Sequence, residues 1–410
     1  MTEDAPALPR PTRAAALDRL DAFKPSMARH YATKRNFDFG PEDRSNVSGL
    51  SPHIRHRLIR EEEAARAALS AHSMSSAEKF IQEVVWRTYF KGWLEMRPGV
   101  WADYTAEVEA DLETLEKDGA LREAYEAAVE GRTGIECFDY WAKELVRTGY
   151  LHNHARMWFS SIWIFTLELP WALGADFFLR HLMDGDAASN TLGWRWVGGL
   201  HTRGKTYLAR ASNINKYTDG RFEMQGYDLA SEAEPLAEDP DHPDPVPPQA
   251  GDVIDRNKPS AILLTDDDLH PESWGVDGLD VKAVVAVSSV HHRSPLETGR
   301  EAAGFNAGAI QDAMGRAAQA FGADADRCDD LAAAARKAKA AGAEQLVTMR
   351  PFAGPMGDLL DAARGDIEKA GLDLVERRRD WDAAFFPYAD KGFFKLKKAI
   401  AKVFSQLGLT

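Results

Sequence analysis

The stretch from Asp184 to Trp196 contains the residue types best suited to holding a ligand. It turns at Gly185, continues through small residues and ends with two tryptophans on either side of an arginine. Small residues let a backbone approach a ligand closely. The amide of Asn190 can donate and accept hydrogen bonds, and the indole rings of Trp194 and Trp196 are flat and polarisable. The alternative is a helix N-terminus after an Asp-Gly turn, followed by two tryptophans of the core.

A serine followed by a proline marks a second candidate site. Ser51 before Pro52 is typical of a helix N-cap with proline at the first helical position. Free N–H groups at the start of a helix, with hydroxyls nearby, can bind a phosphate. Helix capping alone explains the same residues, so their local chemistry leaves both interpretations open.

The helix expected over Ala77–Trp93 carries an acidic, an aromatic and a basic side chain on one face. Glu83, Trp86 and Arg87 are spaced i, i+3 and i+4, which places them together on a helix. The residues alone are equally compatible with a functional face and with an exposed Glu–Arg pair beside a half-buried tryptophan.

A long helix is predicted over Cys137–Leu167. His152 and Arg156 are i, i+4 partners on it, and Asn153 and Met157 form a second pair on an adjacent face. One pair can therefore face a buried cofactor while the other lines the neighbouring cavity.

Charge and metal chemistry around this helix lead to two further expectations. Arg156 is expected to pair with Asp184, because a fixed cation and carboxylate can tune the redox states of a cofactor ring. His152 and His154 are spaced i, i+2, which splays them apart on a helix. Since no further ligand cluster accompanies them, we predict no metal site.

Composition limits the class of protein. The 410 residues, of which 44% are hydrophobic and 11 are tryptophan, are enough for two globular domains. No apolar run reaches the roughly 18 residues of a membrane helix, and the N-terminus lacks the apolar segment of a signal peptide. The two cysteines, Cys137 and Cys328, suit a reducing compartment and cannot supply the four ligands of an iron–sulfur cluster. We therefore predict a cytoplasmic protein with no membrane partner.

The formal net charge of −14 argues against nucleic-acid binding through bulk attraction. A local basic groove remains compatible with it, because the distribution of charge decides binding. Basic residues gather among few acids in the segment 195–221, at Arg195, Arg203, Lys205, Arg210, Lys216 and Arg221. The final helix expected at Lys391–Phe404 is also basic and either approaches DNA or caps the fold.

Patterning divides the chain into three parts. Residues 1–230 are typical of a helical domain, 231–258 form an acidic, proline-rich linker, and 259–410 alternate short apolar runs with alanine-rich helices. Such alternation favours a parallel sheet. Its strands are expected at Ala261–Leu264, Ala283–Ser288, Glu344–Met349 and Leu372–Glu376.

Charged residues follow the first two of these strands. Asp266–Asp268 and His291–Arg293 stand where strand ends could bind a ligand. Neither segment belongs to a glycine-rich phosphate motif, so no nucleotide site is assigned here. Both segments are expected to be solvated loop charges.

Several blocks together resemble the photolyase/cryptochrome family. The residues TGYLHNHARM at 148–157, the Asp-Gly-Asp turn at 184–186, Asn190 and Trp194 follow the family's order and spacing without gaps from Thr133 to Trp196. A looser resemblance extends back to Tyr31. It implies a mainly α FAD-binding helical domain followed by a smaller α/β (Rossmann-like) domain, similar to the antenna domain of photolyases. That domain normally comes first, so whether an antenna chromophore binds is left open.

The resemblance also implies roles for individual residues. The FAD contacts would be Tyr31, Ser48, Leu50, Ser51, His152, Asn153, Arg156, Asp184, Asp186 and Asn190. The pocket for the DNA lesion would be lined by Glu83, Trp86, Asn153, Met157 and Trp196. The DNA contacts would be Arg35, Arg87 and His154, although the family normally has arginine at the position of His154. Trp194 and Trp171 would carry electrons to the flavin; the third tryptophan is missing at Ala128, and Tyr125 is the substitute we suggest.

The function implied by the resemblance is light-driven DNA repair. Reduced FAD would pass one electron to a cyclobutane pyrimidine dimer flipped out of UV-damaged DNA, which splits and returns the electron. Such a monomeric enzyme would be a deoxyribodipyrimidine photolyase. The alternatives are a cryptochrome-like blue-light receptor that binds FAD without repair, a (6-4) photolyase, and a helical scaffold with a tryptophan core. The sequence does not separate single-stranded from double-stranded substrates.

Overall fold

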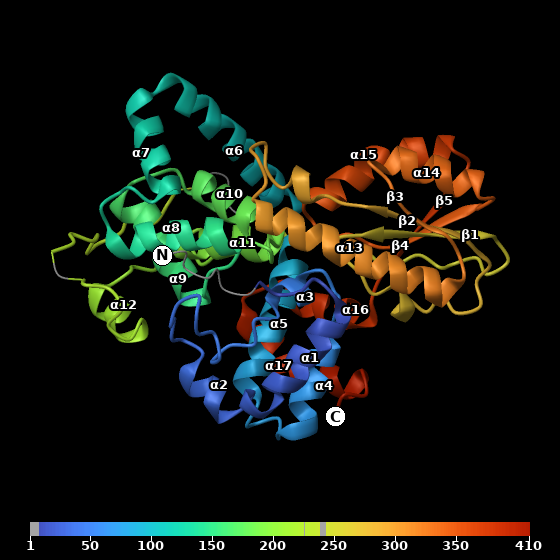
Figure 1. Cartoon of the computed structure of the whole chain (residues 1–410), viewed down its shortest axis with the longest axis horizontal. Coiled ribbons are helices and arrows are strands. Elements are labelled where there is room, and N and C mark those ends of the chain that lie inside the picture. Colours follow the sequence, from blue (N-terminus) through green and yellow to red (C-terminus); the bar gives the residue numbers. More distant parts are fainter. Residues whose placement is uncertain (1–7, 225, 238–242) are drawn as a thin grey trace, which may run out of the picture.

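A computed structural model describes residues 8–224, 226–237 and 243–410. A helical part is followed along the chain by a five-stranded parallel sheet with helices on both faces (Figure 1). The predicted fold class is therefore confirmed. The division of the chain at residues 230 and 258 stays a prediction.

The helical part begins with helices that carry most of the candidate residues. Its elements are α1 (Arg13–Phe23), η1 (Lys24–Ser26), α2 (Arg29–Lys34), α3 (Ser51–Arg55), α4 (Glu61–Ala71), α5 (Glu78–Glu95), α6 (Pro98–Lys117), α7 (Gly119–Glu130), α8 (Glu136–Thr148), α9 (Asn153–Ser161), the π-helical turn η2 (Ile162–Thr166), α10 (Trp171–His181), α11 (Ala187–Val197) and α12 (Ala211–Tyr217). The remainder of the chain comprises β1 (Ser260–Thr265), η3 (Pro271–Ser273), β2 (Val281–Val287), η4 (Val290–His292), α13 (Arg300–Phe321), β3 (Ala325–Arg327), α14 (Leu331–Ala340), β4 (Gln345–Met349), α15 (Pro355–Lys369), β5 (Asp373–Arg377), α16 (Asp380–Phe385), η5 (Phe386–Tyr388) and α17 (Phe393–Gln406).

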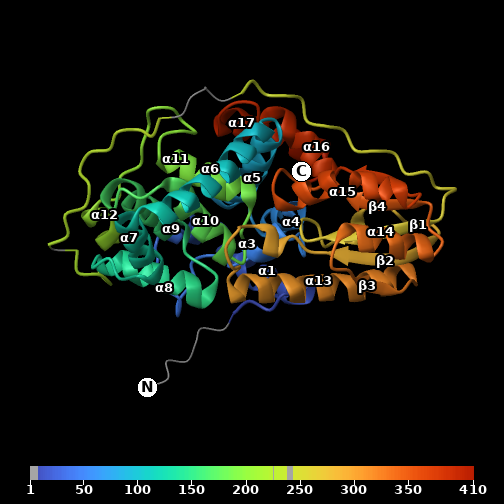
Figure 2. The ribbon, with the colours of Figure 1, turned by 90° about the horizontal axis from the view of Figure 1, so that it is seen from above.

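The sheet has the strand order β3-β2-β1-β4-β5, and every pair of neighbours is parallel. All six residues of the central strand β1 are buried, as expected for a strand covered on both faces. Alternate side chains of β1 enter two separate cores: Ile262 and Leu264 pack with α13, while Ala261 and Leu263 pack with α14 and α15. Figure 2 shows α13 on one side of the sheet and α14 and α15 on the other. The short edge strand β3 is the one strand that the sequence pattern did not predict.

The last two helices return to the helical part. Trp381 of α16 donates from its indole N–H to Thr88 Oγ1 of α5 at 2.9 Å. Leu396 and Val403 of α17 are fully buried in the same apolar core as α5. In Figure 1, these C-terminal helices lie beside α1, α4 and α5, which come from the start of the chain. The sequence pattern groups residues 380–410 with the sheet, whereas their apolar side chains pack against the N-terminal helices.

The long helix predicted over Cys137–Leu167 is broken. Helix α8 ends at Thr148, and Gly149 takes the left-handed conformation (φ 62°) that commonly terminates a helix. His152 then acts as the N-cap of α9, since its side chain accepts a hydrogen bond from the backbone N–H of His154. The prediction of an uninterrupted helix was wrong because it treated the glycine as a tolerated interior residue.

The charges that follow β1 and β2 are not solvated loops. Asp266, Asp267 and Asp268 are 0%, 5% and 2% exposed, and Arg293 is 4% exposed. Only His291 and its neighbour His292 are exposed as expected. That prediction was wrong because the cations that neutralise these carboxylates lie far away in the sequence: Arg55 and Arg57 on the helical part, and Arg379 after β5.

None of the helices in the described part of the chain has the length and apolar character that a membrane span requires.

Helix α17 should contribute to the stability of the helical core although it is last in the chain. Replacing the fully buried Leu396 by alanine should lower the free energy of unfolding by about 2–5 kcal/mol, because the substitution leaves a cavity. Urea unfolding followed by circular dichroism measures this loss. Phe394→Ala is the matched control: Phe394 is 75% exposed, and its loss should change stability by less than about 0.5 kcal/mol. Equal effects of the two variants would contradict the packing of α17 in the core.

Candidate functional site

The acidic turn before α11 is built around two buried carboxylates. Asp186 is the N-cap of α11 and accepts a hydrogen bond from the backbone N–H of Ser189 at 2.8 Å. Asp184 lies two residues earlier, and both aspartates are about 5% exposed. One turn into α11, the amide nitrogen of Asn190 donates to the carbonyl oxygen of Ala175 at 2.7 Å. This bond holds Asn190 against α10.

The predicted pair between Arg156 and Asp184 is present. Nη2 of Arg156 donates to both carboxylate oxygens at 3.0 and 2.9 Å, and Nε donates to the carbonyl oxygen of Leu151 at 2.9 Å. Burial acts to raise the pKa of Asp184, but Arg156, with a smaller contribution from Ser51, holds it below its usual range. Asp184 is therefore an ionised, fixed carboxylate.

Helix α5 supplies cations to the same turn. Lys91 lies 3.5 Å from a carboxylate oxygen of Asp186, and Arg87, one turn earlier, is close enough to lower the pKa of both aspartates. Although burial acts to raise it, the pKa of Asp186 is well below its usual range because of Lys91, Arg55 and Arg87. Arg87, which the resemblance implied as a DNA contact, thus faces the acidic turn.

The hydroxyl-containing segment before α3 differs locally from the prediction. Leu50, not Ser51, is the N-cap residue of α3, and Ser51 and Pro52 form its first turn. The hydroxyl of Ser48 accepts from the backbone N–H of Leu50 at 3.3 Å. Ser51 lies at the acidic turn, since it contributes to the low pKa of Asp184. The fold therefore brings this segment to the acidic turn.

The ring of Tyr31 is buried behind these segments. It packs edge-on against Phe23 and Phe80, with ring centroids 6.1 and 5.4 Å away. Burial, together with the nearby Glu83, raises the pKa of the Tyr31 hydroxyl far above its usual value. Tyr31 is thus a neutral hydrogen-bonding group in an apolar surrounding.

His152 is held in its neutral form. Its Nδ1 accepts from the backbone N–H of His154 at 3.2 Å, so Nε2 carries the proton that it donates to the carbonyl oxygen of Arg35 at 3.0 Å. Burial lowers the pKa of His152 to about 4. A second proton would sit on Nδ1 and face the backbone N–H of His154, which now donates to Nδ1. The repulsion between these two donors also opposes protonation.

The second set of candidate residues lies earlier along α5 and at the start of α9. Glu83 forms an ion pair with Arg35, with Nη1 and Oε1 2.7 Å apart, and is 39% exposed. The surrounding protein nevertheless raises the pKa of Glu83 above its usual value, in spite of Arg35. Trp86 is half-buried, and the ring of Phe393 covers part of it at a centroid distance of 3.7 Å. Phe393 belongs to α17, so no local sequence signal could have linked it to Trp86.

The paired residues of α9 keep the spacing that the sequence predicted. The amide nitrogen of Asn153 lies 3.8 Å from the sulfur of Met157. Asn153 is exposed, whereas the ring of Trp196 is half-buried and tilted against Tyr207 at 5.6 Å. His154 is engaged within the protein, since its Nδ1 bonds to the carbonyl oxygen of Asn36 at 2.6 Å.

Aromatic rings connect Trp194 of α11 to the buried Tyr125 of α7 through a residue that the sequence did not predict. Trp194 and Trp163 are 6.1 Å apart edge-on, and Trp163 and Tyr125 are 6.0 Å apart. Trp171 instead contacts Tyr104 at 5.7 Å. Trp163 carries no local signal beyond its aromatic type, because only the packing of η2 against α7 and α11 places it between the other two rings.

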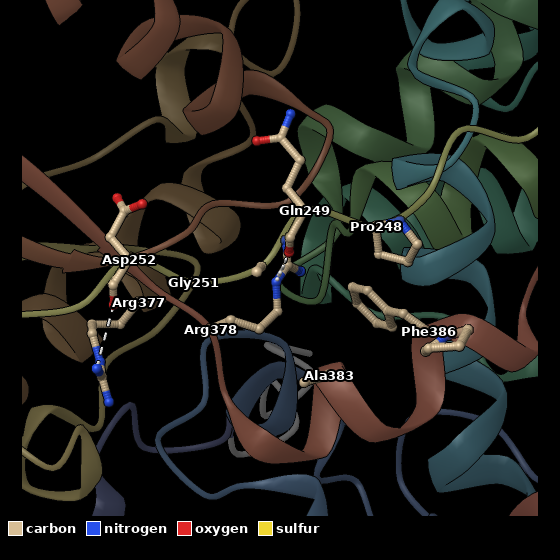
Figure 3. A pocket seen from close by; sticks show the side chains of 10 residues that line it. Pro248, Gln249, Gly251, Asp252, Arg377, Arg378, Ala383 and Phe386 are labelled. Carbon is tan, nitrogen blue, oxygen red and sulfur yellow. Dashed lines mark hydrogen bonds between the residues drawn. The ribbon is translucent and has the colours of Figure 1, made fainter.

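Two open cavities lie away from these residues. The first, of about 350 Å³, is where the linker crosses the end of β5; Figure 3 shows Gln249 and Arg378 among the side chains that line it. Nε of Arg378 donates to the carbonyl oxygen of Gln249 at 3.1 Å. The second, of about 480 Å³, adjoins Trp101 and Asp358. No predicted site residue lines either cavity.

Among the described residues, no group of three potential metal ligands comes together.

The chemistry of the acidic turn fits an anionic, ring-containing ligand. Arg156 and Ser51 act on Asp184 there, Arg55 lies near Asp186, and Asn190 is one turn into the helix that Asp186 caps. In the described part of the chain, two buried polar atoms of α11 also lack a hydrogen-bond partner, Oγ1 of Thr191 and Nε1 of Trp194. A polar ligand against this helix would satisfy such atoms.

Comparisons with known proteins agree with this chemistry. Residues 80–226 match the model of the FAD binding domain of DNA photolyase. The deoxyribodipyrimidine photo-lyase of a Synechococcus strain is 32% identical over 216 residues, which cover 50% of this chain and 43% of that protein. The enzyme of the same name from Thermus thermophilus is 32% identical over 209 residues, which cover 49% and 46% of the two chains. The matched region therefore spans less than half the length of these curated relatives.

Two solved structures are also similar over half of the chain. A bacterial class III photolyase from Agrobacterium tumefaciens aligns with a TM-score of 0.41 and 25% identity, and covers 51% of this chain and 43% of the other. A Synechocystis cryptochrome aligns with the same TM-score, 23% identity and the same coverage.

The matched helices are thus an FAD-binding domain. Over this part of the chain, the resemblance to the photolyase/cryptochrome family that the sequence predicted is confirmed.

The buried neutral imidazole of His152 should make stability depend on pH. In the unfolded chain the imidazole takes up a proton near its ordinary pKa of 6.5, whereas in the folded protein it does so only near 4. Stability should therefore fall as the pH drops from about 6.5 to 4, with a slope of at most about 1.4 kcal/mol per pH unit from this group. His152→Asn keeps an N-cap acceptor without titrating, so its unfolding free energy should depend less on pH. Urea titrations between pH 4 and 7 measure the slopes.

His291→Asn is the control for this comparison, because His291 is exposed and outside the site. Its slope should equal that of the unmodified protein. If His152→Asn shows the same slope as His291→Asn, the imidazole of His152 is not held neutral by the fold.

Proposed function

We propose that this protein repairs UV-damaged DNA by splitting cyclobutane pyrimidine dimers in blue or near-UV light. When bound, reduced FAD supplies the excited electron for this chemistry. The observation that carries the proposal is the double use of α5. Arg87 and Lys91 act electrostatically on the acidic turn, while Glu83 and Trp86, earlier on the same helix, are two of the residues predicted to line the lesion pocket.

The residues at the acidic turn would hold the cofactor. Arg156 and Asp184 form a fixed charge pair for the ring, with Asn190 and His152 nearby, and the segment from Ser48 to Ser51 would meet the diphosphate. These residues would orient the cofactor and set the electrostatic potential around it. Tyr31, Asp186 and Asn153 complete the proposed contact set.

Glu83 would act on the lesion directly. Its pKa is above the usual value of a glutamate, and a protonated Glu83 could donate a hydrogen bond to a pyrimidine carbonyl as negative charge develops there. Arg35 holds this carboxylate without substrate. A DNA phosphate that drew Arg35 away would make Glu83 easier to protonate. Trp86, Met157 and Trp196 would shape the pocket around the flipped bases.

The alternative is a light receptor that binds FAD and repairs nothing. Two of the proposed DNA contacts are already engaged within the protein, Arg35 with Glu83 and His154 with Asn36, which favours this reading. A repair assay separates the two functions. Photoreduced protein is mixed with oligothymidine that contains cyclobutane dimers, and thymine absorbance is followed in the dark and in blue light. Light-dependent recovery supports repair; a photoreducible protein without recovery supports the receptor.

Loss of the Glu83 carboxyl should impair repair more than it impairs FAD binding. A hydrogen bond to a charged group contributes about 1.5–3 kcal/mol, so Glu83→Ala should reduce the repair rate by about tenfold or more. FAD content should stay unchanged, since the acidic turn is intact. Glu78→Ala, on the same helix but paired with Lys397, is the control and should repair normally. Unchanged repair in Glu83→Ala would remove Glu83 from the lesion site.

The aromatic route would supply electrons to the oxidised cofactor. Electrons would pass inward from Tyr125 through Trp163 to Trp194, Tyr125 would lose its phenolic proton, and a thiol in solution would reduce it again. Trp163→Phe should therefore slow light-driven reduction of bound FAD at least tenfold, as followed by its absorption with excess thiol. Trp158→Phe is the control, because Trp158 is as buried as Trp163 but has no ring contact with Trp194 or Tyr125. Equal rates in the two variants would rule out this route, and a slower Trp171→Phe would favour the one predicted from sequence.

A further inference from the structure

Three consecutive carboxylates at the end of β1, here called the β1 carboxylates, are buried between the sheet and the helical part. They are Asp266, Asp267 and Asp268. Charges removed from water in this way are costly unless they are paired and hydrogen-bonded. Several of their partners come from the run Arg55-His56-Arg57, at the end of α3 and just beyond it.

The run Arg55-His56-Arg57 contacts all three of these residues. Other segments also hold two of the carboxylates: Arg379, after β5, donates to both oxygens of Asp268 at 2.5 and 2.7 Å, and Ser289 and Asn306 donate to the carboxylate of Asp266. Nη1 of Arg55 lies 2.8 Å from Oδ1 of Asp267. Nδ1 of His56 bonds to the backbone carbonyl oxygen of Asp266 at 2.6 Å. Nη1 of Arg57 lies 3.3 Å from Oδ2 of Asp268. The second oxygen of Asp267 accepts the backbone N–H of Phe352, which follows β4, at 3.0 Å.

Arg57 adopts a backbone conformation that non-glycine residues avoid. Its φ is +52°, and its side chain is 2% exposed. A bulky residue there carries a cost of order 1 kcal/mol, which persists only where the surroundings compensate. Three carboxylates compensate for this cost. Guanidinium nitrogens of Arg57 lie 3.2 Å from a carboxylate oxygen of Glu61, 3.3 Å from one of Asp268 and 2.7 Å from one of Asp382. Arg57 therefore joins α4, the sheet and α16 at one point.

The same network reaches the acidic turn. Nε of Arg55 donates to the carbonyl oxygen of Gly185 at 3.0 Å and lies 3.8 Å from Oδ2 of Asp186. From the sheet side, Arg293 donates to the carbonyl oxygen of Leu182 at 3.0 Å. Arg55 thus connects Asp267 of the sheet to the turn that carries the proposed FAD contacts.

These side chains fill the place where such a sheet usually binds a ligand. In a parallel sheet whose strand order reverses, ligands bind outside the carboxyl ends of the strands at the point of reversal. Here that point lies between β1 and β4. It is occupied by Arg55 and Arg57, together with Lys91, whose Nζ lies 3.9 Å from the ring centroid of Phe352.

We propose that the sheet serves as a clamp for the FAD-binding segments, with Arg55 and Arg57 as positioning residues held by the β1 carboxylates. The clamp fixes the segment 48–52 through α3 and the turn 184–186 through Arg55. The sheet thus binds a part of its own chain in its ligand crevice. This inference rests on the proposed FAD contacts, but not on repair activity.

The first test measures FAD affinity of an isosteric variant. Asp267→Asn keeps the acceptor for Phe352 but removes the charge that holds Arg55. Its affinity for FAD, titrated into protein stripped of cofactor, should fall at least tenfold. Glu95→Gln is the control, because Glu95 pairs with Arg378 at 2.6 Å across the same two parts of the molecule without touching the FAD segments. It should lower the melting temperature of the cofactor-free protein without a comparable loss of affinity.

Equal losses of FAD affinity in the two variants would overturn the clamp, since both would then act only through general stability. The repair proposal would be unaffected, because the readout is cofactor binding in the dark. A dark affinity loss confined to Asp267→Asn would support the clamp even in a protein that repairs nothing.

The second test uses the unmodified protein and does not depend on a variant that folds. By linkage, a clamp that favours FAD binding must itself be strengthened by FAD. Hydrogen exchange should slow on FAD addition at the backbone amides of Ser289 and Phe352, which donate to Asp266 and Asp267. Amides of β5 should change less. Exchange at Ser289 and Phe352 that responds to FAD no more than β5 does would refute the coupling.

Discussion

The ion pairs around Arg55 and Arg57 are the constraint on which the architecture depends. Buried charges of one sign must be matched by charges of the other sign, and here the two sets lie about 210 residues apart in the chain. The sheet and the helical part therefore cannot separate without exposing or stranding these groups. Since removal of one partner of a buried pair typically costs 3–5 kcal/mol, the interface also makes the two parts interdependent. The segments that we propose as FAD contacts, 48–52 and 184–186, lie directly beside it.

The order of elements along the chain explains why such an interface is needed. The helical part is assembled from the beginning and the end of the sequence, because α16 and α17 pack against α5 after the sheet has been completed. The sheet is thus inserted between two portions of one core and is held at both ends. Phe393, which covers part of Trp86, reaches the predicted lesion pocket only through this return of the chain.

Electrostatics differs between successive turns of α5. Arg87 helps Arg156 to hold the pKa of Asp184 low, and together with Lys91 and Arg55 it lowers the pKa of Asp186. One turn before Arg87, the surrounding protein raises the pKa of Glu83, although Arg35 opposes the shift. A single helix therefore presents fixed charges to one site and a carboxyl of adjustable protonation to the other. This arrangement suits the proposed binding of anionic FAD beside the uncharged pyrimidine bases of a DNA lesion.

The sequence by itself determined the FAD-binding domain, the parallel sheet and the pairing of Arg156 with Asp184. These depend on local patterns: side chains one helical turn apart, short apolar runs that alternate with helices, and a motif with fixed spacing. Tertiary structure alone decided that Asp266–Asp268 are buried, that Trp163 stands between Trp194 and Tyr125, and that α17 belongs to the helical core. The physical reason is the same in each case. Burial, ring contact and charge neutralisation depend on partners that are distant in sequence, and a local pattern of residues carries no information about which distant segment will supply them.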